Sequence, residues 1–119
     1  MFVTAGGWCS ACQSETKQFA QLHATYGSQG LVIFQTLIDD DSQTNPKPPT
    51  ITLLDAWVNT LKPAGACGLD PERISMPYNT DGTLPLNLIL DAKTRKVLDK
   101  SNGFSITTAE GKIKLYLGL

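Results

Sequence analysis

Two closely spaced cysteines stand at the start of a predicted helix, in the motif Trp8-Cys9-Ser10-Ala11-Cys12. The first turn of a helix has unpaired N–H groups and aligned peptide dipoles, which lower the pKa of a thiol placed there. The thiolate is the attacking species in disulfide exchange. The motif therefore predicts a tight, reversible disulfide in which Cys9 is the nucleophile and Cys12 is the resolving partner.

A cysteine pair of this spacing also occurs in zinc sites and in structural disulfides. A zinc site would need every thiol and imidazole of the chain, namely Cys9, Cys12, Cys67 and His23. That set has no recognised zinc-ligand spacing. A permanent structural disulfide across so short a loop would stabilise the fold only weakly, because it removes little entropy from the unfolded chain. Redox chemistry is the favoured interpretation.

The length and composition fit one globular domain with one core. The 119 residues are 41% hydrophobic and 18% charged, with a formal net charge of −1 and no basic block. This balance argues against a nucleic-acid partner, and the apolar runs are too short to span a bilayer. Met1 leads almost directly into the cysteine motif, so we expect a longer natural precursor in which any export signal or lipid anchor lies upstream.

The first half of the chain predicts a βαβ unit. Residues 2–5 are predicted as a strand, residues 10–26 as a helix that stops at Gly27, and residues 31–38 as a central strand covered on both faces. This order favours parallel strands joined by a right-handed connection. The apolar face of the helix is predicted to comprise Phe19, Leu22, His23 and Tyr26.

The second half predicts two more helices and a hairpin. A polar loop over residues 39–49 leads to a helix over residues 51–61 that Lys62-Pro63 ends. Its helically spaced apolar residues are Ile51, Leu54, Val58 and Leu61. Residues 63–82 are irregular, with one helical turn expected near residues 71–73.

Two strands, residues 86–90 and 96–98, follow as a hairpin. A last helix is predicted from the capping-box spacing of Thr107 and Glu110, with Gly118 as its end. Its apolar face comprises Ala109, Ile113, Tyr116 and Leu117. The resulting order, β-α-β-α-β-β-α, predicts a mixed sheet with helices on both faces.

Nearly the whole chain resembles the thioredoxin superfamily, and in particular its extracytoplasmic thiol–disulfide oxidoreductases of the cytochrome-maturation and redoxin type. The resemblance rests on the cysteine motif, Glu15, the strand that ends at Asp39, and the stretch Leu84-Pro85-Leu86-Asn87-Leu88-Ile89-Leu90-Asp91. It implies a thioredoxin-like three-layer α/β fold with a central mixed sheet flanked by helices. It also implies a protein-disulfide reductase type of enzyme without cofactor or metal, active as a monomer in a bacterial periplasm or cell envelope. Its partners would be protein thiols and disulfides and an upstream redox protein.

The resemblance also implies roles for individual residues. Cys9 would attack a substrate disulfide and Cys12 would resolve the mixed disulfide. Pro85 would form a cis peptide bond beside the cysteines, with Met76-Pro77 as the competing cis site. Trp8 would shield the disulfide and contact substrates, against the alternative of an aromatic lid without a specific role.

Glu15 lies three residues after Cys12 and has two interpretations. Its carboxylate would relay a proton from the Cys12 thiol, or it would be a solvated first-turn residue that favours the helix dipole. The sequence departs from thioredoxins proper in three places. Residues 1–5 carry no acid, Lys17 stands where a proline is usual, and Ser10-Ala11 replaces the usual dipeptides.

The other conspicuous residues of the sequence are predicted to have no catalytic role. Asp39-Asp40-Asp41 lacks EF-hand spacing and is predicted to be solvated, although by the resemblance Asp39 would lie near the site. His23 is predicted to be a core or boundary residue, and Cys67 to be non-catalytic. Trp57, Tyr78 and the loop prolines are predicted to be structural.

The sequence is also compatible with three competing functions. A redoxin-type peroxidase would need a threonine and an arginine near the reactive cysteine in a different motif, and the arginine nearest to Cys9 in sequence is Arg73. A non-enzymatic module for copper or zinc would use Cys9, Cys12 and His23. A binding domain would carry a vestigial cysteine pair.

Overall fold

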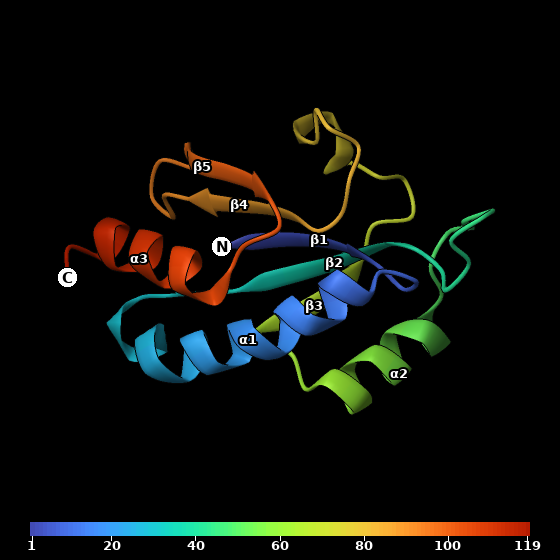
Figure 1. Cartoon of the computed structure of the whole chain (residues 1–119), viewed down its shortest axis with the longest axis horizontal. Coiled ribbons are helices and arrows are strands. Elements are labelled where there is room, and N and C mark those ends of the chain that lie inside the picture. Colours follow the sequence, from blue (N-terminus) through green and yellow to red (C-terminus); the bar gives the residue numbers. More distant parts are fainter.

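A computed structural model describes residues 1–119 as a five-stranded sheet with three α-helices (Figure 1). In chain order the elements are β1 (Phe2–Gly6), α1 (Ser10–Tyr26), the 3-10 turn η1 (Gly27–Gln29), β2 (Phe34–Asp39), α2 (Ile51–Leu61), β3 (Ala66–Leu69), the 3-10 turn η2 (Met76–Tyr78), β4 (Leu86–Leu90), β5 (Val97–Asn102) and α3 (Ile106–Leu117). No helix is both long and apolar enough to cross a bilayer.

The sheet is mixed, as predicted, with the strand order β3-β2-β1-β4-β5. β1 pairs in parallel with β2, and β2 pairs in parallel with β3. β4 is antiparallel to β1 and forms the predicted hairpin with β5. The βαβ unit is therefore confirmed, and it places the start of α1 beside the carboxyl ends of β1 and β2.

Strand β3 was not predicted, and it occupies one edge of the sheet. It has only four residues, too few for a periodic pattern to stand out from the surrounding turn residues. Gly65 lets the chain reach this edge: its φ is +72°, and a Cβ there would lie 2.0 Å from the Ile33 carbonyl oxygen. The helical turn predicted near residues 71–73 is wrong, because the 3-10 turn lies at Met76–Tyr78.

Two strand boundaries also differ from the prediction. β2 begins at Phe34 rather than at residue 31. In the preceding apolar run Leu31 and Ile33 are buried, whereas Val32 is 68% exposed. The start of the run is therefore not covered on both faces. β5 extends to Asn102 rather than ending at residue 98, and it pairs with β4 over this length.

The three α-helices share one face of the sheet, where the core lies. One cluster packs α1 and α3 on β1; its buried members are Val3, Phe19, Leu22, Tyr26, Leu31, Ile33, Ala109 and Ile113. The other packs the cysteines and α2 on β1 and β2; its buried members are Ala5, Cys9, Cys12, Leu37, Trp57 and Leu61. Residues 70–78 lie across the sheet from α1 and α2 (Figure 1) and include η2. The predicted covering of the second face is thus provided by a 3-10 turn and not by an α-helix.

The helix bounds match the prediction closely, whereas the caps and faces differ. Ser105, not Thr107, caps α3, since its hydroxyl accepts the Thr108 N–H. In α2 Ile51 is 68% exposed, and Trp57 and Leu61 are the buried residues. At the end of α1 the helix leads directly into η1, and Gly30 reverses the chain with a φ of +109°.

Candidate active site

Cys9 and Cys12 form a disulfide at the N-terminus of α1, with 5.2 Å between their Cα atoms. Cys9 is the N-cap, and its sulfur accepts the Cys12 N–H at 3.1 Å. An N-cap side chain meets the unpaired N–H groups and the positive end of the helix dipole, so this position favours a thiolate. Cys9 is 3% exposed and Cys12 is 0% exposed, so Cys9 is the slightly more accessible residue of the two.

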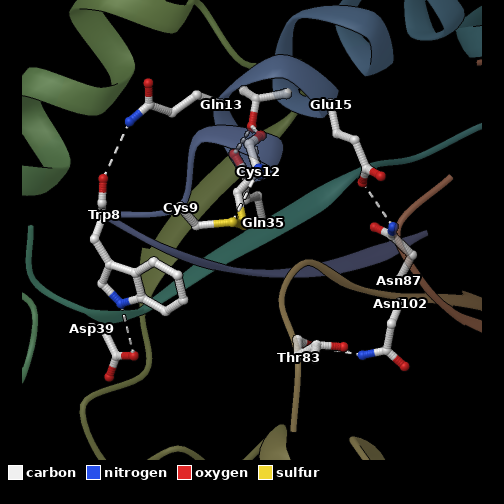
Figure 2. The surroundings of a disulfide bond; sticks show 12 residues. Trp8, Cys9, Cys12, Gln13, Glu15, Gln35, Asp39, Thr83, Asn87 and Asn102 are labelled. Carbon is white, nitrogen blue, oxygen red and sulfur yellow. Dashed lines mark hydrogen bonds between the residues drawn. A yellow bond between two sulfur atoms is a disulfide. The ribbon is translucent and has the colours of Figure 1, made fainter. Parts of the chain in front are cut away.

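Trp8 packs against the cluster that contains both cysteines, and its indole extends toward Asp39 (Figure 2). Its backbone N–H donates to the Asp40 carbonyl oxygen, and its indole N–H donates to the Asp39 carboxylate at 3.3 Å. A Cβ at Gly6 would lie 3.0 Å from the indole nitrogen and 3.2 Å from the Leu84 side chain. The absence of a side chain at Gly6 therefore lets the indole lie close over the end of β1.

The Leu84–Pro85 peptide bond is cis, and no cis bond occurs at Met76-Pro77. Leu84 packs against the cluster that contains both cysteines. The Pro85 carbonyl oxygen accepts the Gly103 N–H, which ties this loop to the end of β5. The segment before β4 therefore lies at the same end of the sheet as the cysteine motif.

Glu15 is buried and is not the solvated first-turn residue of the alternative prediction. Its carboxylate accepts the Asn87 amide N–H at 2.8 Å and also the Phe104 backbone N–H. Burial raises the pKa of the Glu15 carboxyl, and these two hydrogen bonds oppose the rise. Figure 2 shows the side chain directed toward Asn87 rather than toward the disulfide.

A chain of polar side chains lies behind Cys12. The Thr16 hydroxyl donates to the Cys12 carbonyl oxygen at 2.8 Å and accepts from the Gln35 amide at 2.8 Å. The Gln35 oxygen accepts the Trp57 indole N–H at 3.0 Å. These bonds tie α1, β2 and α2 together beneath the resolving cysteine.

Asp39 is 4% exposed at the end of β2, which contradicts the prediction of a solvated acidic run. Besides the indole of Trp8, its carboxylate binds the Arg73 guanidinium at 2.8 and 3.0 Å. Asp40 is also engaged, since its carboxylate accepts the backbone N–H groups of Ser42 and Lys47 and its pKa is lowered by them.

Cys67 and His23 stay outside this arrangement. Cys67 lies on β3 with its sulfur 4.0 Å from the Gln35 oxygen, and burial raises the pKa of its thiol. His23 is half-buried near the end of α1. Nowhere does the structure gather three or more histidine, cysteine, aspartate or glutamate side chains that could hold a metal ion. The structure therefore does not bring His23 or Cys67 together with Cys9 and Cys12.

Comparison with known proteins identifies the fold. No family model and no curated protein matches the sequence. Among solved structures, a Chlorobium tepidum protein assigned as thiol:disulfide interchange protein DsbE matches with a TM-score of 0.76 and 16% identity, over 98% of this chain and 77% of its own. The thioredoxin domain of a thiol-disulfide oxidoreductase from Bacteroides vulgatus gives a TM-score of 0.75 and 11% identity, over 98% and 76%. The chain has a thioredoxin fold.

A third match to this thioredoxin fold is a secreted Mycobacterium tuberculosis disulfide oxidoreductase homologous to E. coli DsbE. It gives a TM-score of 0.72 and 11% identity, over 96% of this chain and 78% of its own. At such identities the likeness establishes the fold class predicted from the sequence, and the chemistry has to be argued from the residues.

Three functional candidates of this thioredoxin fold were not singled out from the sequence. Asn87 is the one polar residue of β4, and this interruption was a signal that could have found it. Gln35 had a weaker signal, because β2 also contains Thr36 and Asp39. Arg73 had no such signal, because it is far from the cysteines in sequence and lies in an irregular segment.

Proposed function

We propose that this protein is a thiol–disulfide oxidoreductase that exchanges disulfides with protein substrates. The observation that carries the proposal is the Cys9–Cys12 disulfide at the start of α1, with the Cys9 sulfur at the N-cap. The thioredoxin fold of the solved oxidoreductases is consistent with it.

In the reducing direction the chemistry is a two-step exchange. The Cys9 thiolate attacks one sulfur of a substrate disulfide, which forms a mixed disulfide and releases the other substrate sulfur as a thiolate. Cys12 then loses its proton and attacks the Cys9 sulfur. The second substrate thiolate leaves, two electrons have passed to the substrate, and the Cys9–Cys12 disulfide has closed.

Glu15 is proposed to take up the proton that Cys12 loses. Supporting this role are its place on α1 three residues after Cys12, its burial and the upward direction of its pKa. No hydrogen bond joins the Glu15 carboxyl to either sulfur, so the transfer would pass through water.

Trp8 and Pro85 are proposed to form the surface that a substrate meets. Trp8 and Leu84, the residue before Pro85, both pack against the cluster that contains the two cysteines. Protein thiols and disulfides are the proposed partners, together with a separate redox protein that resets the cysteine pair. We further propose that the protein acts as a monomer outside the cytoplasm of a bacterium. The match from Mycobacterium tuberculosis is a secreted protein, which supports the proposed location.

Single-cysteine variants test the proposal. Cys9→Ser is expected to abolish reduction of a disulfide-bonded protein such as insulin, and Cys12→Ser to accumulate a mixed disulfide at Cys9 that is visible by mass. Cys67→Ser is the matched control and should retain full activity, because burial disfavours its thiolate. Full exchange activity in Cys9→Ser would refute the proposal.

The direction of the reaction is set by the reduction potential of the pair. Equilibration with glutathione and with dithiothreitol, read by thiol alkylation and mass, gives this potential. A value near about −270 mV would mark a reductant, and one near about −120 mV an oxidant.

A further inference from the structure

Arg73 reaches the redox site from a segment that packs on the other side of the sheet. Its guanidinium binds both oxygens of the Asp39 carboxylate, and Asp39 in turn holds the indole of Trp8, the neighbour of Cys9. Gly6 pairs with Asp39 across the two strands, and the Cys9 N–H donates to the Gly6 carbonyl oxygen. Asp39 therefore lies next to the turn that carries the cysteine motif.

The segment around Arg73 is built by polar contacts. The Asp70 carboxylate accepts the N–H groups of Ile74 and Ser75 and the Ser75 hydroxyl, at 2.8 to 3.0 Å. Arg73 itself has a φ of +57°, which is an unfavourable backbone conformation for a residue with a side chain. Ile74, the next residue, is 73% exposed. The turn thus buries little apolar surface. Its main structural effect is to place the Arg73 guanidinium on the Asp39 carboxylate.

A buried carboxylate needs such a partner. An unpaired charge in an apolar setting is strongly unfavourable, and it also opposes any second negative charge close by. The charged groups near Asp39 at this end of the sheet include Asp40 directly after β2, Glu15 from α1 and Arg73 from the turn. Lys47 lies beside Asp40. Asp40 is held by backbone N–H groups and Glu15 faces Asn87, so Arg73 is the one cation bound to Asp39.

We propose that Arg73 is a positioning residue of the redox site: it holds Asp39 on the Trp8 indole and cancels the negative charge of that carboxylate next to the turn that carries Cys9. The inference rests on the proposed function, since it concerns the reactivity of the same thiolate. It assigns a role to the segment between β3 and β4, which supplies the guanidinium.

Three variants separate an electrostatic role from a purely structural one. Arg73→Gln removes the charge and leaves Asp39 uncompensated. Asp39→Asn removes the carboxylate but keeps an oxygen that can accept the Trp8 indole N–H. The double variant removes both charges together. Arg95→Gln is the matched control, because Arg95 is also exposed, has a φ of +60° and lies on the β4–β5 hairpin.

The readout is the rate at which iodoacetamide alkylates Cys9 of the reduced protein at pH 7, with the site identified by peptide mass. Arg73→Gln is expected to slow this rate by about threefold to tenfold, since one added unit of thiol pKa lowers the thiolate fraction tenfold. The double variant is expected to return to within about twofold of the wild type, and Arg95→Gln to leave the rate unchanged.

Two results would overturn the inference. One is an Arg73→Gln rate equal to that of Arg95→Gln. The other is a double variant as slow as Arg73→Gln, which would mean that Arg73 acts only by holding its turn. Insulin reduction by the wild type tests the proposed function separately. If the wild type does not reduce insulin but Arg73→Gln still slows the alkylation of Cys9, the proposed enzymatic function is rejected and the electrostatic role of Arg73 is retained.

Discussion

Single polar residues in apolar surroundings distinguish this site from a generic cysteine pair. Glu15 meets Asn87, which is fully buried on β4, and the Asn87 amide oxygen has no hydrogen-bond partner. A side-chain amide can turn over to present either its N–H or its oxygen. The Asn87 amide can therefore donate to Glu15 when Glu15 is a carboxylate and accept from it when Glu15 is protonated. This suits a group proposed to gain and lose a proton.

The Glu15 carboxyl makes the stability of the fold depend on pH. Burial raises its pKa above the usual 4.5, so the folded protein binds this proton more tightly than the unfolded chain does. The resulting stabilisation is complete below the unfolded-state pKa and is lost as the pH rises through the folded-state pKa. We therefore expect Glu15 to contribute a fall in the free energy of unfolding of the wild type as the pH rises above 4.5. This contribution should be absent in Glu15→Gln.

Urea unfolding at a series of pH values measures the effect. Three aspartates provide an internal control. Hydrogen bonds from backbone N–H groups lower the pKa values of Asp40, Asp70 and Asp91. The contribution of these aspartates to the free energy of unfolding is lost as the pH falls, and this loss should be equal in the wild type and in Glu15→Gln. A wild type and a Glu15→Gln variant with parallel profiles above pH 4.5 would contradict the prediction.

At the scale of elements, short segments between the predicted ones shape the site. β3 extends the sheet beyond β2 and brings Cys67 next to Gln35. The turn after β3 carries Arg73 to Asp39. Neither element has a strong periodic pattern, and both depend on local backbone conformations that only the folded chain stabilises.

Gly65 is the residue on which β3 depends. A Cβ at this position would lie 2.0 Å from the Ile33 carbonyl oxygen, so Gly65→Ala is expected to displace β3 from β2. Gly82 is the matched control, because its φ of +71° is nearly the same as the +72° of Gly65 but a Cβ there has no atom within 4 Å. Both variants share the backbone strain of about 1–2 kcal/mol, and Gly65→Ala should lose about 1–3 kcal/mol more from overpacking.

Hydrogen exchange locates this loss. The β3 amides that pair with β2 should lose protection in Gly65→Ala and keep it in Gly82→Ala. Equal unfolding free energies for the two variants would mean that β3 tolerates a side chain at Gly65.

At the scale of the whole molecule, the core lies between one face of the sheet and all three α-helices. The other face carries residues 70–78, and several apolar side chains remain exposed there or nearby. They include Phe34, Ile74, Tyr78 and Val97, which are 39% to 73% exposed. The stability of the domain should therefore be unequally divided between the two faces.

A pair of isoleucines tests this division. Ile113 is 2% exposed on α3 and Ile74 is 73% exposed. Ile113→Ala is expected to lower the free energy of unfolding by about 2–5 kcal/mol, and Ile74→Ala to change it by less than about 0.5 kcal/mol. Chemical denaturation followed by circular dichroism compares them. A loss of similar size at Ile74 would show that residues 70–78 form a second core.

Local patterns were sufficient to predict much of this molecule. The bounds of α1 and α2 followed from apolar spacing and from Lys62-Pro63, and the parallel β1-α1-β2 unit followed from the order of the elements. The cysteine pair at the start of α1 followed from its spacing, because neighbours within one helical turn do not depend on the rest of the fold.

Contacts between distant segments could be decided only by the tertiary structure. The burial of Asp39 and its pairing with Arg73, 34 residues further along the chain, depend on how a loop returns to the end of β2. The pairing of Glu15 with Asn87 crosses 72 residues. No local pattern specifies such partners, because a buried charge or amide is satisfied by whichever segment the packing of the sheet and helices brings within hydrogen-bond distance.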